Sequence, residues 1–549
     1  MNTRTNPEIS NNVRSSKKGD SAAGFDLTRA ACILIAGQTT IKFMTFAMNQ
    51  MLIQHVTPTG LGLCSLIEFV INTVLFISRE PVRLSVQAMN TELKEYDQLL
   101  VNFSYLPLVF CAIIVGPFVH WQLGFGSLFL SSWHYQVCLV AIIASLVLEI
   151  LSEPYYNANQ TQLNVTKRAK IESFASFVKC VVQFTIVMNV RMKAGKDATF
   201  VVAYILAQFF YSLTVFVCYS RFRLALPRLS STGAFLEPLT WNYLRSLFLQ
   251  QIFKHFLTEG DRFVLNQFFP IVDQGYYSIV LNYGSLMARL LFQPVEETIR
   301  MNTAKLFASN QPETCKRANL NRNIYKVVTV YVYILTLLLI FAPRNTSFFI
   351  HQAFPNIADP EKFVEVFKIY WYYLPLLSMN GVLEALFNSV YTDPDHVSLY
   401  SRLMFVNSAC FYLTSAFFIK RLQLGLVGLI LANSINMLIR ILFCAFEVKP
   451  FLNFKDQNYT KFLYFWAFCA VIVAIQNKIV AGDTVTAIQF GQDFGLGLIA
   501  LAFIVIIESK IYRLAYDLLA NPSATVRTTV AEIIPRSETF LMKHVPTGQ

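Results

Sequence analysis

Fourteen apolar segments of 18 to 26 residues constrain how this chain of 549 residues can fold. A helix needs about 20 apolar residues to cross the hydrocarbon core of a bilayer. Lipid offers no partner to an unpaired backbone group, so segments of this kind form helices. Charged residues make up only 14% of the chain, against about 25% in a soluble domain. The sequence therefore predicts an all-α polytopic membrane protein.

Two polar connections, 221–240 and 296–325, interrupt the series, and the first separates two sets of six segments. We expect two pseudo-symmetric six-helix lobes followed by two extra helices. The expected helices are 30–54, 57–78, 98–119, 134–153, 171–190, 198–219, 241–266, 274–295, 325–342, 363–388, 397–419, 424–446, 461–481 and 493–513. The expected domains are a polar tail at 1–27, lobes at 28–220 and 241–447 joined by 221–240, the extra helices at 448–515, and a tail at 516–549.

The distribution of Lys and Arg predicts the orientation in the membrane. The connections on the side of the termini carry 28 of these residues, and those on the other side carry 8. Positively charged loops stay in the cytosol, so both termini are expected there. The same distribution accounts for the net charge of +12 without invoking nucleic acid. We expect no cleavable signal peptide before the first segment, and we expect the first helix to act as its own signal.

The two lobes look related in sequence. When residues 60–83 are shifted by 213 positions onto 273–296, Gly62 meets Gly275 and Pro81 meets Pro294. Ser65/Ser278 and Val82/Val295 also coincide. Internal repeats are common in transporters, with the substrate site at the repeat interface. The alternative is a coincidence between two apolar helices.

Ionisable residues inside the apolar segments are the candidate functional groups, because a charge at mid-bilayer is costly and faces the protein interior or a water-filled cavity. The segment 241–266 is the richest. If it forms one helix, its ionisable residues fall within an arc of roughly 160°. The complete set is Lys42, Glu68, Glu149, Lys179, Lys254, His255, Glu259, Asp261, Arg262, Arg289, Glu384 and Arg440.

Two interpretations of this set remain open: a lock of ion pairs between helices, and a polar cavity for a charged headgroup. For the four cations Lys42, Arg262, Arg289 and Arg440, we favour binding of a phosphate, since the arginine fork donates hydrogen bonds in pairs. Four carboxylates are expected to tune or gate the cavity, and one of them, Glu384, is also a candidate proton or cation site. These carboxylates are Glu68, Glu259, Asp261 and Glu384.

Other motifs point away from catalysis and from bound cofactors. No G-x-x-x-x-G-K-[ST] loop for ATP is present, and the ten Cys are scattered without a C-x-x-C pair. Asp393-Pro394-Asp395 is typical of a turn. Asn345-Thr346-Ser347 is an N-glycosylation sequon that the topology places on the lumenal side. We therefore expect no enzyme, no cofactor and no metal centre.

Several motifs resemble the eukaryotic RFT family of oligosaccharide translocation proteins, within the superfamily of multidrug, oligosaccharidyl-lipid and polysaccharide exporters. The most specific is Leu257-Thr258-Glu259-Gly260-Asp261-Arg262, followed by Phe292-Gln293-Pro294-Val295-Glu296-Glu297. The resemblance covers about residues 28–515. Further matching stretches are 42–46, 75–80, 149–154, 284–289, 380–384 and 428–433, with Asn436 and Arg440 after them. Gln54-His55 departs from the basic residue that the family carries near the end of the first helix.

The resemblance implies a transporter fold of two lobes around a central cavity, in the endoplasmic reticulum membrane. It implies that a dolichol diphosphate bearing five mannoses and two N-acetylglucosamines moves from the cytosolic to the lumenal leaflet for protein N-glycosylation. The expected partners are this glycolipid, membrane lipid and other membrane proteins of the pathway. Two alternatives stay open: a glycolipid-binding chaperone or scaffold that does not flip its cargo, and a cation-coupled exporter of small molecules.

Overall fold

The described part of the chain folds into helices and contains no strand. In this computed structural model, the described residues are 44, 47–48, 50–52, 56–89, 93, 95–123, 132–161, 165–189, 196–220, 226–229, 235–308, 312–354, 357, 359–391, 394–452, 459–479 and 486–508. The expected first helix, 30–54, lies mostly outside them.

Ten of the described helical stretches are long and apolar enough to cross a membrane. They correspond to ten of the fourteen predicted segments. Of the other four, 30–54 is mostly undescribed and three form less apolar or shorter helices. The count of fourteen stays a prediction. The ten stretches are Pro58–Gln87, Tyr96–Val115, Gln136–Thr161, Lys170–Asn189, Asp197–Ser220, Glu313–Ala353, Leu399–Lys420, Gly425–Phe451, Thr460–Lys478 and Ala487–Ile507.

The chain divides into two compact units. The first comprises residues up to Ser285, together with Ala353–Asp359 and Ser398–Asn436. It holds α2 (Pro58–Gln87), α3 (Tyr96–Ser104), α4 (Leu106–Leu123), α5 (Ser132–Leu151), α6 (Glu153–Thr161), α7 (Val165–Asn189), α8 (Lys196–Ser220), α9 (Pro238–Thr258) and α10 (Gly260–Phe268). It also holds most of α11 (Ile271–Met287), α15 (Pro394–Lys420) and the first half of α16 (Gly425–Val448).

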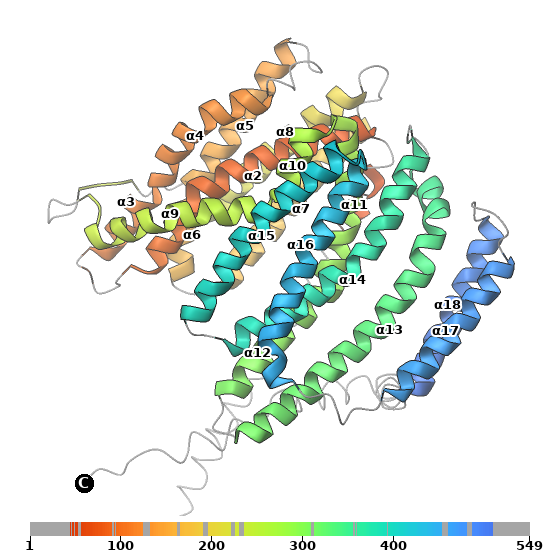
Figure 1. Cartoon of the computed structure of the whole chain (residues 1–549). Coiled ribbons are helices and arrows are strands. Elements are labelled where there is room, and N and C mark those ends of the chain that lie inside the picture. The colour runs from red at the N-terminus through yellow and green to blue at the C-terminus, as the bar shows by residue number, and fades with distance from the viewer. Residues whose placement is uncertain are drawn as a thin grey trace, which may run out of the picture. The chain divides into compact units, whose positions relative to one another are not determined.

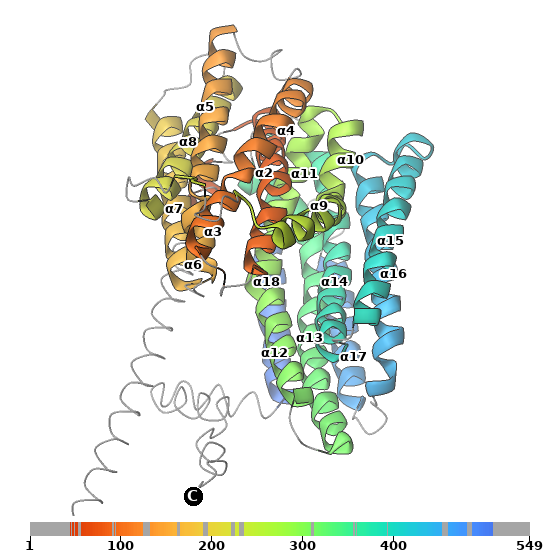
Figure 2. The ribbon, with the colours of Figure 1, turned by 90° about the vertical axis from the view of Figure 1, so that its left-hand side faces the viewer.

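An apolar core holds the first unit together. Side chains of α2, α4, α5 and α8 form its largest cluster, in which Val74 and Ala203 are fully buried. The neighbouring helices α7 and α8 run side by side (Figure 2), and α2 also packs along α9. The helix α2 therefore contacts several neighbours at once and is the centre of this unit.

The second unit contains Leu286–Gln352, Pro360–Val397 and the residues from Met437 onward. Its elements are the π-turn η2 (Ala288–Phe292), α12 (Gln293–Ala308), α13 (Glu313–Ala353), α14 (Pro360–Val390), the end of α16, η3 (Lys449–Phe451), α17 (Thr460–Ile479) and α18 (Ala487–Ile507). The last two helices lie side by side (Figure 1). An aromatic cluster that includes Tyr333 and Phe465 packs them against α13.

A turn that precedes a proline divides one predicted helix and marks the end of another. The segment 98–119 forms α3 and α4, with a turn at Tyr105 two residues before Pro107, and 134–153 ends at Ser152, two residues before Pro154. Proline lacks the N–H that an α-helix needs at that position. The helix therefore restarts with proline at its second residue, where no such bond is required.

The single helix expected at 241–266 is wrong. The helix α9 ends at Thr258, Glu259 has the non-helical dihedral angles φ −104° and ψ 16°, and α10 begins at Gly260. Glycine is a poor helix former, so Gly260 next to the break favours a continuous helix less than another residue would. Consequently the five ionisable residues of this segment do not share one helical face: Lys254 and His255 belong to α9, whereas Asp261 and Arg262 belong to α10.

Candidate functional site

Two of the four predicted phosphate-binding cations lie outside the part of the structure that describes side chains. Lys42 falls in the undescribed start of the chain. The backbone of Arg289 is described and lies in the π-turn η2, where the Gln293 N–H donates to the Ala288 carbonyl, but the position of its side chain is not. Turns of this type recur at functional sites. The roles of both residues stay predictions.

Arg262 lies beside the carboxylate predicted to orient it. Its Nε atom is 3.3 Å from Glu259 Oε2, and each side chain is 25% exposed. Its terminal Nη nitrogens have no hydrogen-bond partner among the described residues. The pair therefore holds the guanidinium by one edge and leaves its paired donors available to a ligand.

Asp261 accepts hydrogen bonds within the first unit. Its Oδ1 accepts a hydrogen bond of 2.9 Å from the Arg262 backbone N–H, and its Oδ2 accepts one of 3.3 Å from the Tyr277 hydroxyl. Asn433 of α16 contacts the same hydroxyl at 3.5 Å. The Asp261 carboxylate therefore fixes the start of α10 against α11, which is an orienting role.

Glu68 is the carboxylate with the fewest contacts. It is half-buried on α2 and makes no hydrogen bond or ion pair with another described residue. It nevertheless acts electrostatically on Arg262 and on the buried Tyr204. Glu68, Glu259, Asp261 and Arg262 together give this part of the first unit more negative than positive groups. The tuning role of the carboxylates stays a prediction.

Glu384 and Arg440 form an ion pair inside the second unit. Arg440 Nη2 contacts Glu384 Oε2, and the side chains are 15% and 26% exposed. Asn380 Nδ2 donates to the same oxygen at 3.3 Å. A carboxylate that already accepts from a guanidinium and an amide is a poor site for a free cation or proton. The geometry thus favours orientation of Arg440 over ion coupling at Glu384.

A network of ion pairs that the sequence reasoning missed crosses the first unit. Arg83 donates to both oxygens of the fully buried Glu153, at 2.8 and 2.6 Å, and its guanidinium lies 3.7 Å from the Tyr156 ring centroid. Arg79 contacts Glu149 at 3.2 Å. The signal was present, because Arg79/Arg83 and Glu149/Glu153 are matching pairs of opposite charge at helical spacing of four.

The network extends toward the middle of the bundle. Glu149 Oε1 also accepts from Gln208 at 3.1 Å and from Ser212 at 2.9 Å. Gln208 in turn accepts a 2.7 Å hydrogen bond from Lys179 Nζ. Glu149 and Lys179, noted as intramembrane charges, are therefore internally satisfied, which makes them structural residues of the first unit.

A second missed cluster joins α13 to the last two helices. Arg344 Nε donates to Asp493 Oδ2 at 3.1 Å, and Asp493 is 1% exposed. Gln476 and Asn345 donate to the same carboxylate, each at 3.1 Å. A buried charge needs such a complete set of partners. The cluster accordingly anchors α17 and α18.

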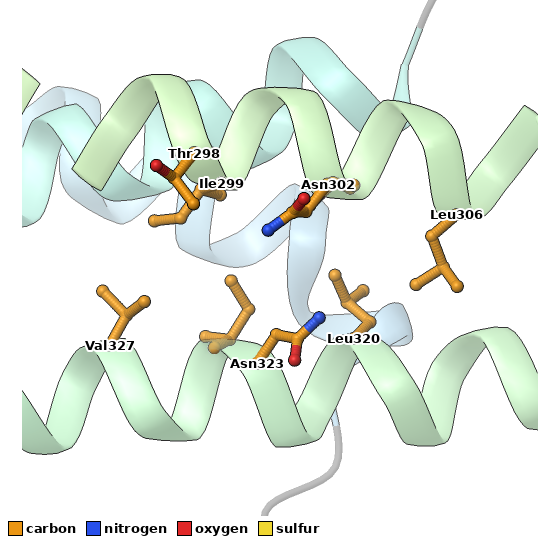
Figure 3. Close-up of a pocket in the computed structure, with 9 residues that line it drawn as sticks. Thr298, Ile299, Asn302, Leu306, Leu320, Asn323 and Val327 are labelled. Atoms are coloured by element: carbon orange, nitrogen blue, oxygen red, sulfur yellow. The ribbon is translucent and has the colours of Figure 1, made fainter. Parts of the chain in front are cut away.

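A small pocket lies between α12 and α13 (Figure 3). Asn302 and Asn323 point toward one another across it, among aliphatic side chains such as Ile299 and Leu320. Its lining, taken from the described residues, carries no charged side chain. The pocket therefore lacks the cations that a diphosphate would need.

The helical architecture matches a known transporter fold. The solved structure of lipid II flippase MurJ, in an inward closed conformation, aligns with a TM-score of 0.62 over 86% of this chain and 99% of that chain, at 13% identity. With ten apolar stretches able to span a membrane, the fold defines a multi-pass α-helical membrane protein of the same class of architecture.

The sequence comparisons specify the family. The model of the Rft protein family matches residues 26–518. The Man(5)GlcNAc(2)-PP-dolichol translocation protein RFT1 of Candida albicans is 32% identical over 531 residues, covering 89% of this chain and 94% of its own length. The protein of the same name from Saccharomyces cerevisiae is 30% identical over 520 residues, covering 84% and 88%. The chain belongs to the Rft protein family.

Proposed function

We propose that this protein moves a dolichol diphosphate carrying five mannoses and two N-acetylglucosamines between the leaflets of the endoplasmic reticulum membrane. The observation that carries the proposal is the match, over nearly the whole chain, to relatives named as translocation proteins for that glycolipid. The flippase-like architecture supports it. The activity is transport, and the proposal includes no catalytic step.

The diphosphate would be held by cations that carboxylates keep in place. Arg262 has Glu259 on one edge and Arg440 has Glu384. A guanidinium held in this way loses less conformational freedom when it binds a phosphate, which favours binding. Lys42 and Arg289 complete the proposed set, while Glu68 and Asp261 tune the charge around Arg262. The polyprenyl tail would remain in lipid.

We also propose that both termini lie in the cytosol, which the distribution of Lys and Arg supports. The glycolipid would then be taken up from the cytosolic leaflet. Other membrane proteins of the N-glycosylation pathway are the proposed neighbours. A non-flipping chaperone would use the same binding residues but would not move the glycolipid.

The decisive experiment places the purified protein in liposomes with the dolichol-linked heptasaccharide and follows its arrival in the opposite leaflet. We expect protein-dependent movement that Arg262→Gln abolishes, with Arg262→Lys retaining part of it because one cation remains. Binding without movement would replace the flippase by a chaperone. Absence of binding in the wild-type protein would overturn the proposal.

A further inference from the structure

A stripe of exposed polar side chains runs along α9. Asn242, Ser246, Gln250 and Lys254 recur at every fourth residue, and all four are exposed. Residues four apart are neighbours on one side of a helix. The opposite side of α9 is buried and consists of Leu244, Leu247, Gln251 and His255.

Contacts of the buried side place α9 beside a membrane-spanning helix. His255 Nε2 lies 2.9 Å from Thr73 Oγ1, near the middle of α2, and its ring stacks on Phe76. Leu244 packs in one cluster with Val82 and Val86, toward the Gln87 end of α2. The helix α9 therefore runs along α2 from its Gln87 end, beyond the apolar segment 57–78, to its middle, and the Lys254 end of α9 reaches membrane depth.

At that depth an exposed polar stripe needs an aqueous or polar partner. Burying an amide in hydrocarbon without a hydrogen bond is strongly unfavourable. Asn242, Gln250 and Lys254 have no side-chain partner among the described residues. The Lys254 end of the stripe therefore lines a space that holds water or a ligand, and Asn242 and Ser246 continue the stripe toward the Gln87 end of α2.

The chemistry of the stripe fits sugar hydroxyls. An amide both donates and accepts hydrogen bonds, as does a hydroxyl of a hexose, and the stripe contains no carboxylate. Tyr243 and Phe253 on the same exposed side are 45% and 52% exposed. Aromatic rings of this kind pack against the apolar C–H face of a pyranose. We infer that the stripe binds the neutral oligosaccharide of the glycolipid, an inference that rests on the proposed function.

The order of groups along the chain matches the order of groups along the ligand. The uncharged Asn242, Ser246 and Gln250 come first, then Lys254, and Arg262 follows after the break at Glu259. From Asn242 to Lys254 the helix rises about 18 Å, at about 1.5 Å per residue. With the diphosphate at the cationic end, the sugars extend along the amides toward Asn242.

The test compares two ligands on the full-length protein in nanodiscs: the dolichol-linked heptasaccharide and dolichyl diphosphate without sugars. In the double variant Asn242→Leu/Gln250→Met we expect Kd for the glycolipid to rise roughly thirtyfold, since two hydrogen bonds are lost. We expect Kd for dolichyl diphosphate to stay unchanged. Gln136→Met, which removes an exposed amide at the start of α5, is the matched control and should change neither value.

The outcomes separate this inference from the proposed function. If Kd for the glycolipid does not change in the double variant, the stripe does not bind the oligosaccharide. An equal rise of Kd for both ligands would exclude it as well. Arg262→Gln should weaken both ligands alike, and its failure to do so would remove the diphosphate contact while leaving the stripe in place. Sugar-dependent binding in a protein that moves nothing across liposomes would support the stripe and reject only the translocation step.

Discussion

Gly62 and Gly275, 213 residues apart in the sequence, occupy equivalent positions in two helices that press against each other. A Cβ atom on Gly62 would overlap the carbonyl oxygen of Ile271, and one on Gly275 would overlap the carbonyl oxygen of Pro58. Each carbonyl belongs to the residue four positions before the other glycine. The contact is therefore reciprocal, and it supports the 213-residue register of the internal repeat.

Substitution of either glycine should prevent this close approach. For Gly62→Ala and Gly275→Ala we expect the helices to separate, at a cost of about 1–3 kcal/mol or more. The thermal unfolding midpoint in detergent should fall clearly in both. Gly491→Ala and Gly495→Ala are matched controls in α18, because nothing lies within 4 Å of a Cβ there. Equal midpoints for all four variants would contradict the close-packed crossing.

Most of the helices could be predicted from the sequence, because a run of apolar residues long enough to cross a bilayer has few alternatives to a helix. The register of the internal repeat could also be predicted. Gly62 and Gly275, which align in that register, are the residues at which the two helix backbones touch. The break at Glu259 was not visible. No proline marks it, and the ionisable residues on both sides fit one continuous helix as a pattern.

The candidate site was predicted only in part. Glu259 was expected to act on the nearby cations, and it contacts Arg262. Glu384 was expected to tune or gate the cavity or to take up a proton or cation, and its contact with Arg440 was not predicted. The partners of Arg79 and Arg83 are 70 residues away in the sequence, so only tertiary structure identifies them. Once these charges are paired, the number of intramembrane groups available to a ligand becomes much smaller.

The buried ion pair between Arg83 and Glu153 should be important for stability. In Glu153→Gln the guanidinium keeps its buried position but loses its counter-charge, and we expect a loss of about 3–5 kcal/mol. Glu172→Gln removes a partner of Arg168 in a pair that is 37% and 41% exposed, so we expect a loss below about 1 kcal/mol. Thermal unfolding of both variants in the same detergent measures the difference. A similar midpoint for the two would mean that Glu153 is not desolvated.

Exchange of the charges at Glu384 and Arg440 distinguishes an ion-pair lock from a ligand site. Arg440→Glu alone places two carboxylates together and should destabilise the protein. The double variant Glu384→Arg/Arg440→Glu restores the pair, and we expect the midpoint to recover. Glycolipid binding should stay weak because the cation has moved. If glycolipid binding recovers together with stability, Arg440 only stabilises the helices through its ion pair and does not bind the ligand.

Stability should depend on pH through Glu237, which caps α9. Its carboxylate accepts hydrogen bonds from the Leu239 and Thr240 N–H groups. Partial burial raises the pKa of Glu237, but hydrogen bonds from Thr240 and Leu239 outweigh it, so the pKa lies below the usual 4.5. Because a depressed pKa stabilises the protein only while the group is ionised, the contribution is present at neutral pH and disappears as the pH falls below about 4.5.

We therefore expect the free energy of unfolding of Glu237→Gln at pH 7 to lie below that of the wild type by about 0.3–1 kcal/mol, the contribution of a negative charge at a helix N-terminus. The gap should close toward pH 3. Glu365→Gln is the control, as Glu365 is exposed in the interior of α14 and has no partner among the described residues. A gap that stays constant with pH would show that ionisation of Glu237 is not involved.

We expect that Asn345, although it lies in an N-glycosylation sequon, carries no glycan. Asn345 lies inside α13, and its Nδ2 donates to the Phe341 carbonyl at 2.9 Å and to Asp493 at 3.1 Å. Ser347, which supplies the hydroxyl of the sequon, is buried. Glycan acceptors lie in surface loops, so Asn345→Gln should leave the electrophoretic mobility unchanged, with and without endoglycosidase. A mobility shift on deglycosylation that this substitution removes would mean that α13 unwinds at Asn345.

The ion-pair network of the first unit has an electrical consequence. Its cations Arg79, Arg83, Arg168 and Lys179 equal in number its carboxylates Glu80, Glu149, Glu153 and Glu172. Moving one elementary charge through a potential of 100 mV takes about 2.3 kcal/mol, but a rigid bundle of closed pairs moves no net charge. The network itself would thus contribute no voltage dependence to rocking of these helices, and any voltage dependence of the cycle would have to come from the cargo or from charges outside the network, such as Glu68.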